Sequence, residues 1–194
     1  MENGSGGSGY AGLLEIATRC GSGAVFKRGI CWSAESDAEQ SWSQWTRSYF
    51  QPLILPHLVK VQSLSARQFV REVLLRDAEF SGVLSEEMQR NSLEAGRYLL
   101  LSKSIKTDRT LERVQRAIQA GIAPGHFATL FAVRAAVFSV APRTAVLAYL
   151  LQELVCEIAD PDDQAELLAL GLSEVNDFFR RSVELEPETV PSNA

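Results

Sequence analysis

The chain has 194 residues, a hydrophobic fraction of 46% and a net charge of −5, which fits one globular domain with a substantial core. The acidic balance, with a pI of about 5.2, provides no overall attraction for nucleic acid. The charge is unevenly placed, because residues 151–194 carry 11 Asp and Glu against 2 Arg. This acidic end is either a solvated helix face with a tail, or a surface for a basic partner or a basic patch of a second subunit.

The cysteines and the apolar stretches indicate the cellular compartment in which the protein works. Cys20, Cys31 and Cys156 are odd in number and lack paired spacing, which argues against a disulfide framework. No charged segment followed by an apolar one opens the chain, and the longest apolar stretch is interrupted by Arg134 and Pro142. We therefore expect a cytoplasmic protein with no secretory signal and no membrane span.

Helical periodicity dominates the first part of the chain. Residues 1–9 read MENGSGGSG, a composition typical of a flexible segment. Residues 21–34 are ambiguous, and Pro52 and Pro56 predict a short or broken helix around them. The remaining apolar patterns and N-cap residues predict helices over residues 10–20, from Ser36 or Asp37 to about Phe50, from Ser65, from Ser85, and from Thr107 or Asp108 to Gly121.

Residues 121–158 form the most apolar part of the chain. Pro124 and Pro142 each stand where a helix can begin and are each followed by an apolar helical pattern. We expect a buried helical hairpin, followed by a last helix from about Pro161 to Leu185 and a disordered tail over residues 186–194. No alternating β pattern is present, so residues 10–185 are predicted to form a single-domain, all-α bundle of about 8–10 helices.

The helix expected after Ser85 has a face of small and apolar residues. Gly96 lies on this face although glycine costs on the order of 1 kcal/mol against alanine in a helix. Close approach of a neighbouring helix is a reasonable compensation, and a tolerated surface glycine is the alternative. The face is formed by Met88, Ser92, Ala95, Gly96 and Leu99.

Arg134 falls beside Phe127 and Phe131 on an apolar helix face. A buried guanidinium without a partner is too costly to expect. Either it pairs with Glu153 or Glu157, an i, i+4 acidic pair on the next helix, or another chain covers this face. Arginine is enriched at interfaces, so both explanations stay open.

Catalytic and metal-binding motifs are lacking. The two histidines, His57 and His126, stand far apart in the sequence, and no HExxH, CxxC, P-loop or Rossmann pattern occurs. The acidic residues Asp160, Asp162 and Asp163 fit a helix cap better than a cation site. His126 is a metal ligand, a partner contact or a satisfied cap-region histidine, and the residues favour the third. We expect no enzymatic activity, no metal site and no cofactor.

Two segments of the central hairpin carry a family resemblance. Gly125-His126-Phe127 through Phe131 is similar to the GHxxxxF segment of UreF, the urease accessory protein family, and Ala148-Tyr149-Leu150 is similar to its following AYL. Leu13-Leu14-Glu15-Ile16-Ala17 looks like the family's LLQLA, and residues 85–100 resemble its polar helix ending in a small residue and leucines.

The chain departs from the family pattern in two places. Ala24-Val25 stand where the family's PTGGFxxSxGLE loop has two glycines, and only Phe26 matches its aromatic. Residues 157–161 lack the basic residue and the glycine that usually follow the AYL segment. Both departures fall where contacts with partners would be made.

The resemblance implies an all-α, dimeric and non-enzymatic chaperone in the cytoplasm. It implies UreD/UreH-like and UreG-like accessory proteins and apo-urease as partners, in a complex that delivers nickel. The residues expected to bind partners are His126, Tyr149, Arg134, Glu153 and Glu157, together with the acidic C-terminal helix.

An alternative function is a helical regulatory or ligand-binding module. In that case Phe127, Phe131, Phe138 and Leu151 would bound an apolar pocket.

Overall fold

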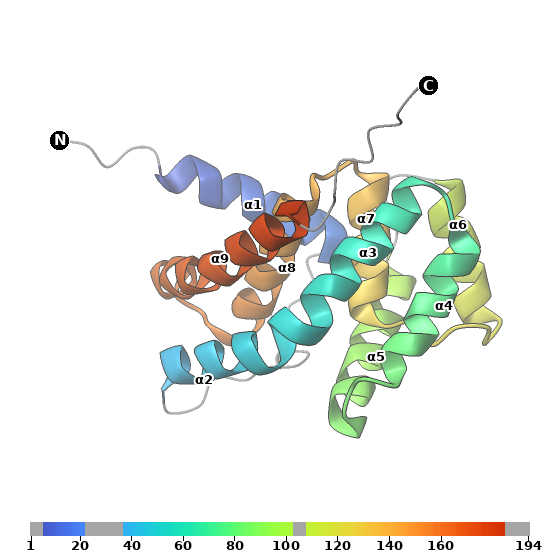
Figure 1. Ribbon diagram of the computed structural model, residues 1–194, viewed down its shortest axis with the longest axis horizontal. Coiled ribbons are helices and arrows are strands. Elements are labelled where there is room, and N and C mark those ends of the chain that lie inside the picture. The colour runs from blue at the N-terminus through green and yellow to red at the C-terminus, as the bar shows by residue number, and fades with distance from the viewer. Residues whose placement is uncertain (1–5, 22–36, 103–107, 185–194) are drawn as a thin grey trace, which may run out of the picture.

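The computed structural model describes residues 6–21, 37–102 and 108–184, and within these ranges every regular element is a helix (Figure 1). This confirms the predicted all-α fold. The expected tail and most of the ambiguous segment 21–34 lie outside the described residues. The helices are α1 (Gly6–Gly21), α2 (Ala38–Trp45), the π-helix η1 (Thr46–Ile54), α3 (Leu55–Ala66), α4 (Val70–Ser81), α5 (Glu86–Leu101), α6 (Arg109–Gln119), α7 (Phe127–Val137), α8 (Pro142–Glu157) and α9 (Pro161–Glu184).

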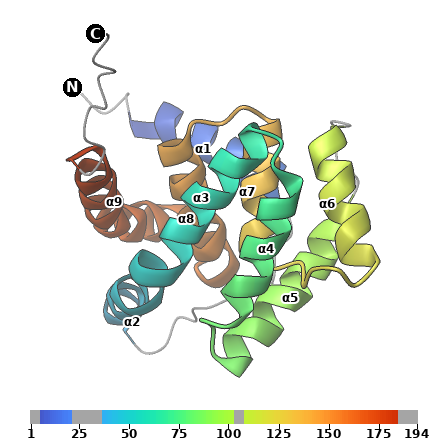
Figure 2. The same cartoon turned by 45° about the vertical axis from the view of Figure 1, so that its right-hand side comes forward.

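Helix α7 is the centre of the fold. It contacts α1, α3, α5, α6 and α8, and all its residues except Ala136 are buried, as expected for a helix that is apolar all round. Helices α4, α5 and α6 lie at one end of the molecule, and α2, α8 and α9 lie at the other (Figures 1 and 2). The predicted hairpin of α7 and α8 is largely buried. Within it, however, α7 packs most extensively on α3, and α8 packs most extensively on α1.

The two prolines of the hairpin differ in their positions. Pro142 is the first residue of α8, as predicted. The prediction for Pro124 is wrong, because α7 begins only at Phe127, with His126 as its N-cap. Gly125 lies between Pro124 and the helix with φ +85°. A left-handed residue cannot continue a right-handed helix, so no helix runs from Pro124 into α7.

Two more helix starts differ from the predictions. Ser65 does not cap a helix, since it lies inside α3 and its hydroxyl donates to the Val61 carbonyl at 2.7 Å. The next helix begins at Val70 instead. Helix α1 begins at Gly6, inside the segment expected to be flexible. The predicted caps Asp37, Ser85 and Asp108 are confirmed by side-chain hydrogen bonds to the first turns of α2, α5 and α6.

No break occurs at Pro52, because α2, η1 and α3 form one continuous helical path. Pro52 has no N–H to donate, and its ring would clash with a carbonyl in an ordinary α-helical turn. It lies inside the π-helical segment, where each turn holds an extra residue. The Leu55 N–H donates to the Phe50 carbonyl five residues earlier. The wider turn accommodates the proline, and the chain stays helical.

The small-residue face of α5 is buried, as predicted, and it packs on the loop before α7. Met88, Ser92, Ala95, Gly96 and Leu99 are its buried residues. A Cβ atom on Gly96 would lie 1.9 Å from the Gly125 carbonyl oxygen. The close approach of the two backbones therefore requires glycine at position 96.

We expect Gly96→Ala to destabilise the fold by about 3 kcal/mol, the upper end for overpacking, because the added methyl meets backbone atoms and cannot avoid them by a rotamer change. Urea unfolding at equilibrium measures this. Gly12→Ala in α1 is the matched control, since a Cβ there meets nothing within 4 Å. Its stability should stay the same or rise by up to about 1 kcal/mol. Equal changes in the two variants would contradict the close packing.

Candidate functional site

The five residues predicted to bind partners all lie at or near the central helices. His126, Tyr149, Arg134 and Glu153 have exposed fractions of 0%, 1%, 5% and 0%, and Glu157 is half-buried. Buried side chains support a surface without forming it. Their part in partner binding stays a prediction.

His126 connects three helices. It is the N-cap residue of α7, its Nε2 lies 2.7 Å from the Ser81 hydroxyl of α4, and its Nδ1 lies 3.2 Å from the Ser92 hydroxyl of α5. Both ring nitrogens thus have hydrogen-bond partners, which confirms the prediction of a satisfied cap-region histidine. Burial lowers the pKa of His126, and the nearby charge of Asp77 opposes this shift.

Asp77 of α4 binds the backbone just before α7. Its side chain is fully buried. One carboxylate oxygen accepts the Gly125 N–H at 2.6 Å, and the other accepts the His126 N–H at 3.0 Å. The carboxylate thereby satisfies two N–H groups at the start of α7, a favourable place for a negative charge. Asp77 is not among the predicted site residues, although an aspartate between the apolar positions Val73 and Phe80 of one helix is a signal for it.

Phe80 lies between the two histidines. Its ring stacks on His57 with centroids 3.9 Å apart and meets His126 edge-on at 5.4 Å. The His57 Nε2 lies 2.8 Å from the Thr129 hydroxyl of α7. Burial, with smaller contributions from the His126 and Arg76 charges, lowers the pKa of His57 to about 3. His57 is therefore neutral at physiological pH, and its contacts with Phe80 and Thr129 tie α3, α4 and α7 together.

The contact between Ser81 and His126 has the atoms of a nucleophile and a base, but not their arrangement. In a catalytic triad the carboxylate orients the imidazole through its ring N–H. Here Asp77 accepts backbone N–H groups, and the second ring nitrogen faces Ser92. The geometry is that of a structural junction.

Arg134 is a buried residue of α7 that lies near Cys20 of α1. Its guanidinium donates to the Ser102 hydroxyl at 3.2 Å. Burial lowers the pKa of Arg134, and burial raises the pKa of the Cys20 thiol to about 12 against the opposing charge of Arg134. Glu153 is buried on α8. The pairing of Arg134 with Glu153 or Glu157 stays a prediction.

Three of the four residues expected to bound the apolar pocket of the alternative function lie in the core. Phe127, Phe131 and Leu151 are fully buried. Tyr149 meets Phe131 edge-on with ring centroids 5.3 Å apart, and its ring centroid lies 5.9 Å from that of Phe127. The Phe127 and Phe131 rings also lie close together, with centroids 5.9 Å apart, and a pocket bounded by these residues stays a prediction.

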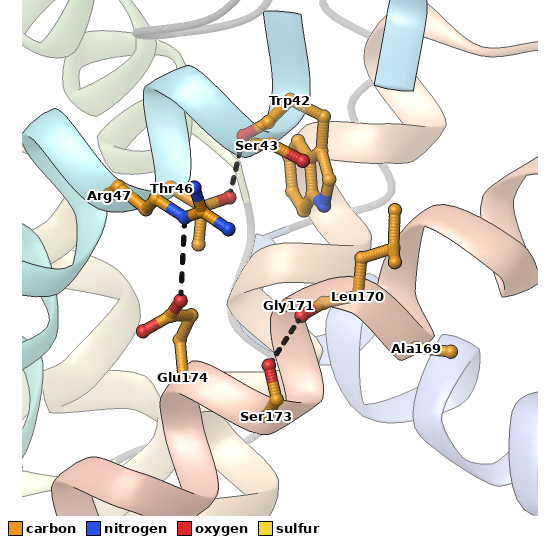
Figure 3. A pocket seen from close by; sticks show the side chains of 9 residues that line it. All are labelled: Trp42, Ser43, Thr46, Arg47, Ala169, Leu170, Gly171, Ser173 and Glu174. Atoms are coloured by element: carbon orange, nitrogen blue, oxygen red, sulfur yellow. Dashed lines mark hydrogen bonds and ion pairs between the residues drawn. The ribbon is translucent and has the colours of Figure 1, made fainter. Parts of the chain in front are cut away.

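A cavity of about 260 Å³ lies elsewhere, between the α2–η1 path and α9 (Figure 3). Arg47 and Glu174 face each other across it, with the Arg47 Nε 3.8 Å from a carboxylate oxygen of Glu174. Its lining residues are Trp42, Ser43, Thr46, Arg47, Ala169, Leu170, Gly171, Ser173 and Glu174.

Within residues 6–21, 37–102 and 108–184, no three His, Cys, Asp or Glu side chains gather as a metal site would require. None of the helices in these ranges combines the length and apolar character that crossing a membrane demands.

We expect Asp77→Asn to lower the free energy of unfolding by about 2–3 kcal/mol, because an amide can accept only one of the two N–H groups and turns its own NH₂ toward the other. Chemical denaturation measures the loss. Asp163→Asn, at an exposed first-turn position of α9, should cost less than about 1 kcal/mol. A similar cost for both would show that the Asp77 contacts contribute little.

We expect the protein to lose stability as the pH falls below about 6.5, the ordinary pKa of histidine. In the unfolded chain His57 takes up a proton near that pH, whereas folded His57 stays neutral down to a pH of about 3. The unfolded state therefore binds more protons, and stability falls by up to about 1.4 kcal/mol per pH unit for this residue. His57→Gln should flatten the dependence in denaturation curves between pH 6.5 and 5. An unchanged slope would contradict the burial of a neutral His57.

Comparison with known protein families shows the family to which this chain belongs. The family model described as UreF matches residues 37–155, from the N-cap of α2 to near the end of α8. No curated protein and no solved structure matches the chain. The match spans more than half of the sequence and contains the Asp77–His126 junction and Arg134. The chain belongs to the UreF family of urease accessory proteins.

Proposed function

We propose that this chain is a non-enzymatic scaffold for urease maturation. It binds UreD/UreH-like and UreG-like accessory proteins and apo-urease in the cytoplasm, acts as a homodimer, and supports delivery of nickel. The single observation that carries this proposal is the UreF match over residues 37–155.

The fold is suited to binding other proteins. Other helices pack around α7, and the outer faces of these helices can contact other proteins. Large apolar side chains are exposed on α4, α5 and the loop before α7, and such side chains contribute to partner surfaces where they gather. They are Leu75, Tyr98, Leu101 and Ile122, with exposed fractions of 59%, 51%, 85% and 69%.

The test is co-purification of the tagged chain with UreD-type and UreG-type proteins from the same source, followed by nickel-dependent activation of apo-urease. We expect both accessory proteins to be retained and urease activity to fall strongly when the chain is omitted. The control is the folded Gly12→Ala variant, which should behave as the wild type. If a folded chain retains neither protein, the urease role is wrong.

A further inference from the structure

The cavity between the α2–η1 path and α9 has an apolar edge and charged rims. Leu170 of α9 is 39% exposed, and Ala169 and Ser173 are exposed beside it. Figure 3 shows Arg47 from η1 and Glu174 from α9 facing each other at one side of this opening. The two walls come from helices that lie side by side and contact each other.

The volume of the cavity limits the size of the group that can bind in it. At about 260 Å³, the cavity is smaller than the roughly 300–1,000 Å³ of pockets that enclose a drug-sized ligand or cofactor. It is large enough for one or two apolar side chains. The volume therefore suits an anchoring side chain from another protein better than a cofactor.

The charges beside the cavity favour a basic occupant. The exposed residues Asp162, Asp163 and Glu166 precede the cavity on α9, and no basic residue occurs in α9 before Arg180. Asp162 and Asp163 lie in the first turn, where the helix dipole explains them. Glu166 lies beyond this turn and four residues before Leu170, so the two share one face of the helix.

The Arg47–Glu174 contact does not close the cavity. The Arg47 side chain is 74% exposed, and the separation is 3.8 Å, a geometry that contributes little to stability. Arg47 can turn into solvent, which leaves Glu174 available for a cation from the partner.

We propose that this cavity receives one apolar side chain from a basic segment of a partner protein, with Lys or Arg side chains of that segment lying against Glu166 and Glu174. The proposal deepens the scaffold function, because it gives the chemistry of a segment that an accessory protein would present. The docking itself does not depend on which accessory protein supplies it.

The experiment titrates the ¹⁵N-labelled full chain with three short peptides. One contains Lys and Leu, one has Ser in place of Leu, and one has Glu in place of Lys. We expect the Lys–Leu peptide to bind at least about tenfold more tightly than the others, with amide shifts concentrated at Ser43, Arg47, Leu170 and Ser173. Equal binding of the Ser peptide, or shifts spread over all acidic residues, would overturn the proposal.

Two variants of the chain test the cavity and the negative charge beside it separately. Ala169→Trp should fill the cavity, and Glu166→Lys should reverse the adjacent charge. Each should weaken the Lys–Leu peptide by about tenfold. The matched controls, Ala78→Trp on α4 and Glu94→Lys on α5, change exposed residues of helices at the other end of the molecule and should leave binding unchanged.

Light scattering of the free chain tests whether a second copy of the chain, instead of a partner protein, occupies the cavity. If Ala169→Trp dissociates a dimer, this face joins two copies and the proposal fails. Since the peptide experiment uses no accessory protein, its result is independent of the co-purification test. Peptide binding without retention of accessory proteins would overturn the urease role alone, and the reverse result would overturn only the docking proposal.

Discussion

The fold depends on one buried carboxylate. Asp77 of α4 accepts the backbone N–H groups of Gly125 and His126 at 2.6 and 3.0 Å, and such charge-assisted bonds are stronger than neutral ones. They fix the point at which α7 begins. Because α1, α3, α5, α6 and α8 all contact α7, the position of that first turn sets how the surrounding helices pack. Gly96 permits α5 to approach the same turn, and the histidines on either side of Phe80 join α3 and α4 to it.

Periodicity predicts most of the helices, but not the unbroken helical path through Pro52 or all of the helix ends. The helix ends that were predicted wrongly lack the usual local signals. Gln68 follows α3 with φ 61°, and the Phe69 N–H bonds the Leu64 carbonyl at 3.0 Å, which is the cap that glycine usually makes. Without a glycine, the sequence does not show where α3 ends, and it wrongly predicts Ser65 as the start of the next helix. Pro124 was misassigned for a different reason, because the group that determines where α7 starts comes from Asp77, far away in the sequence.

The candidate site was predictable where one helix carried the whole pattern. The face around Gly96 repeats at helical spacing, so its burial followed from the sequence alone. The hydrogen bonds of His126 to Ser81 and Ser92 join different helices, and no local spacing indicates them. His126 and Tyr149 are buried, so the GHxxxxF and AYL segments that carry the family resemblance lie in the centre of the fold. These two side chains can support a partner surface without forming it, and their part in partner binding stays a prediction.

The two walls of the cavity differ in how they relate to the family. The matched residues 37–155 include Trp42, Thr46 and Arg47 but end before α9. Helix α9 packs chiefly on α8, η1 and α2, at the end of the molecule away from α4, α5 and α6 (Figure 1). Exposed changes on α9 can therefore alter what the cavity accepts without disturbing Asp77 or the turn that it holds. Separating the stabilising centre from the docking surface in this way allows one fold to keep its stability while the chemistry of its partner changes.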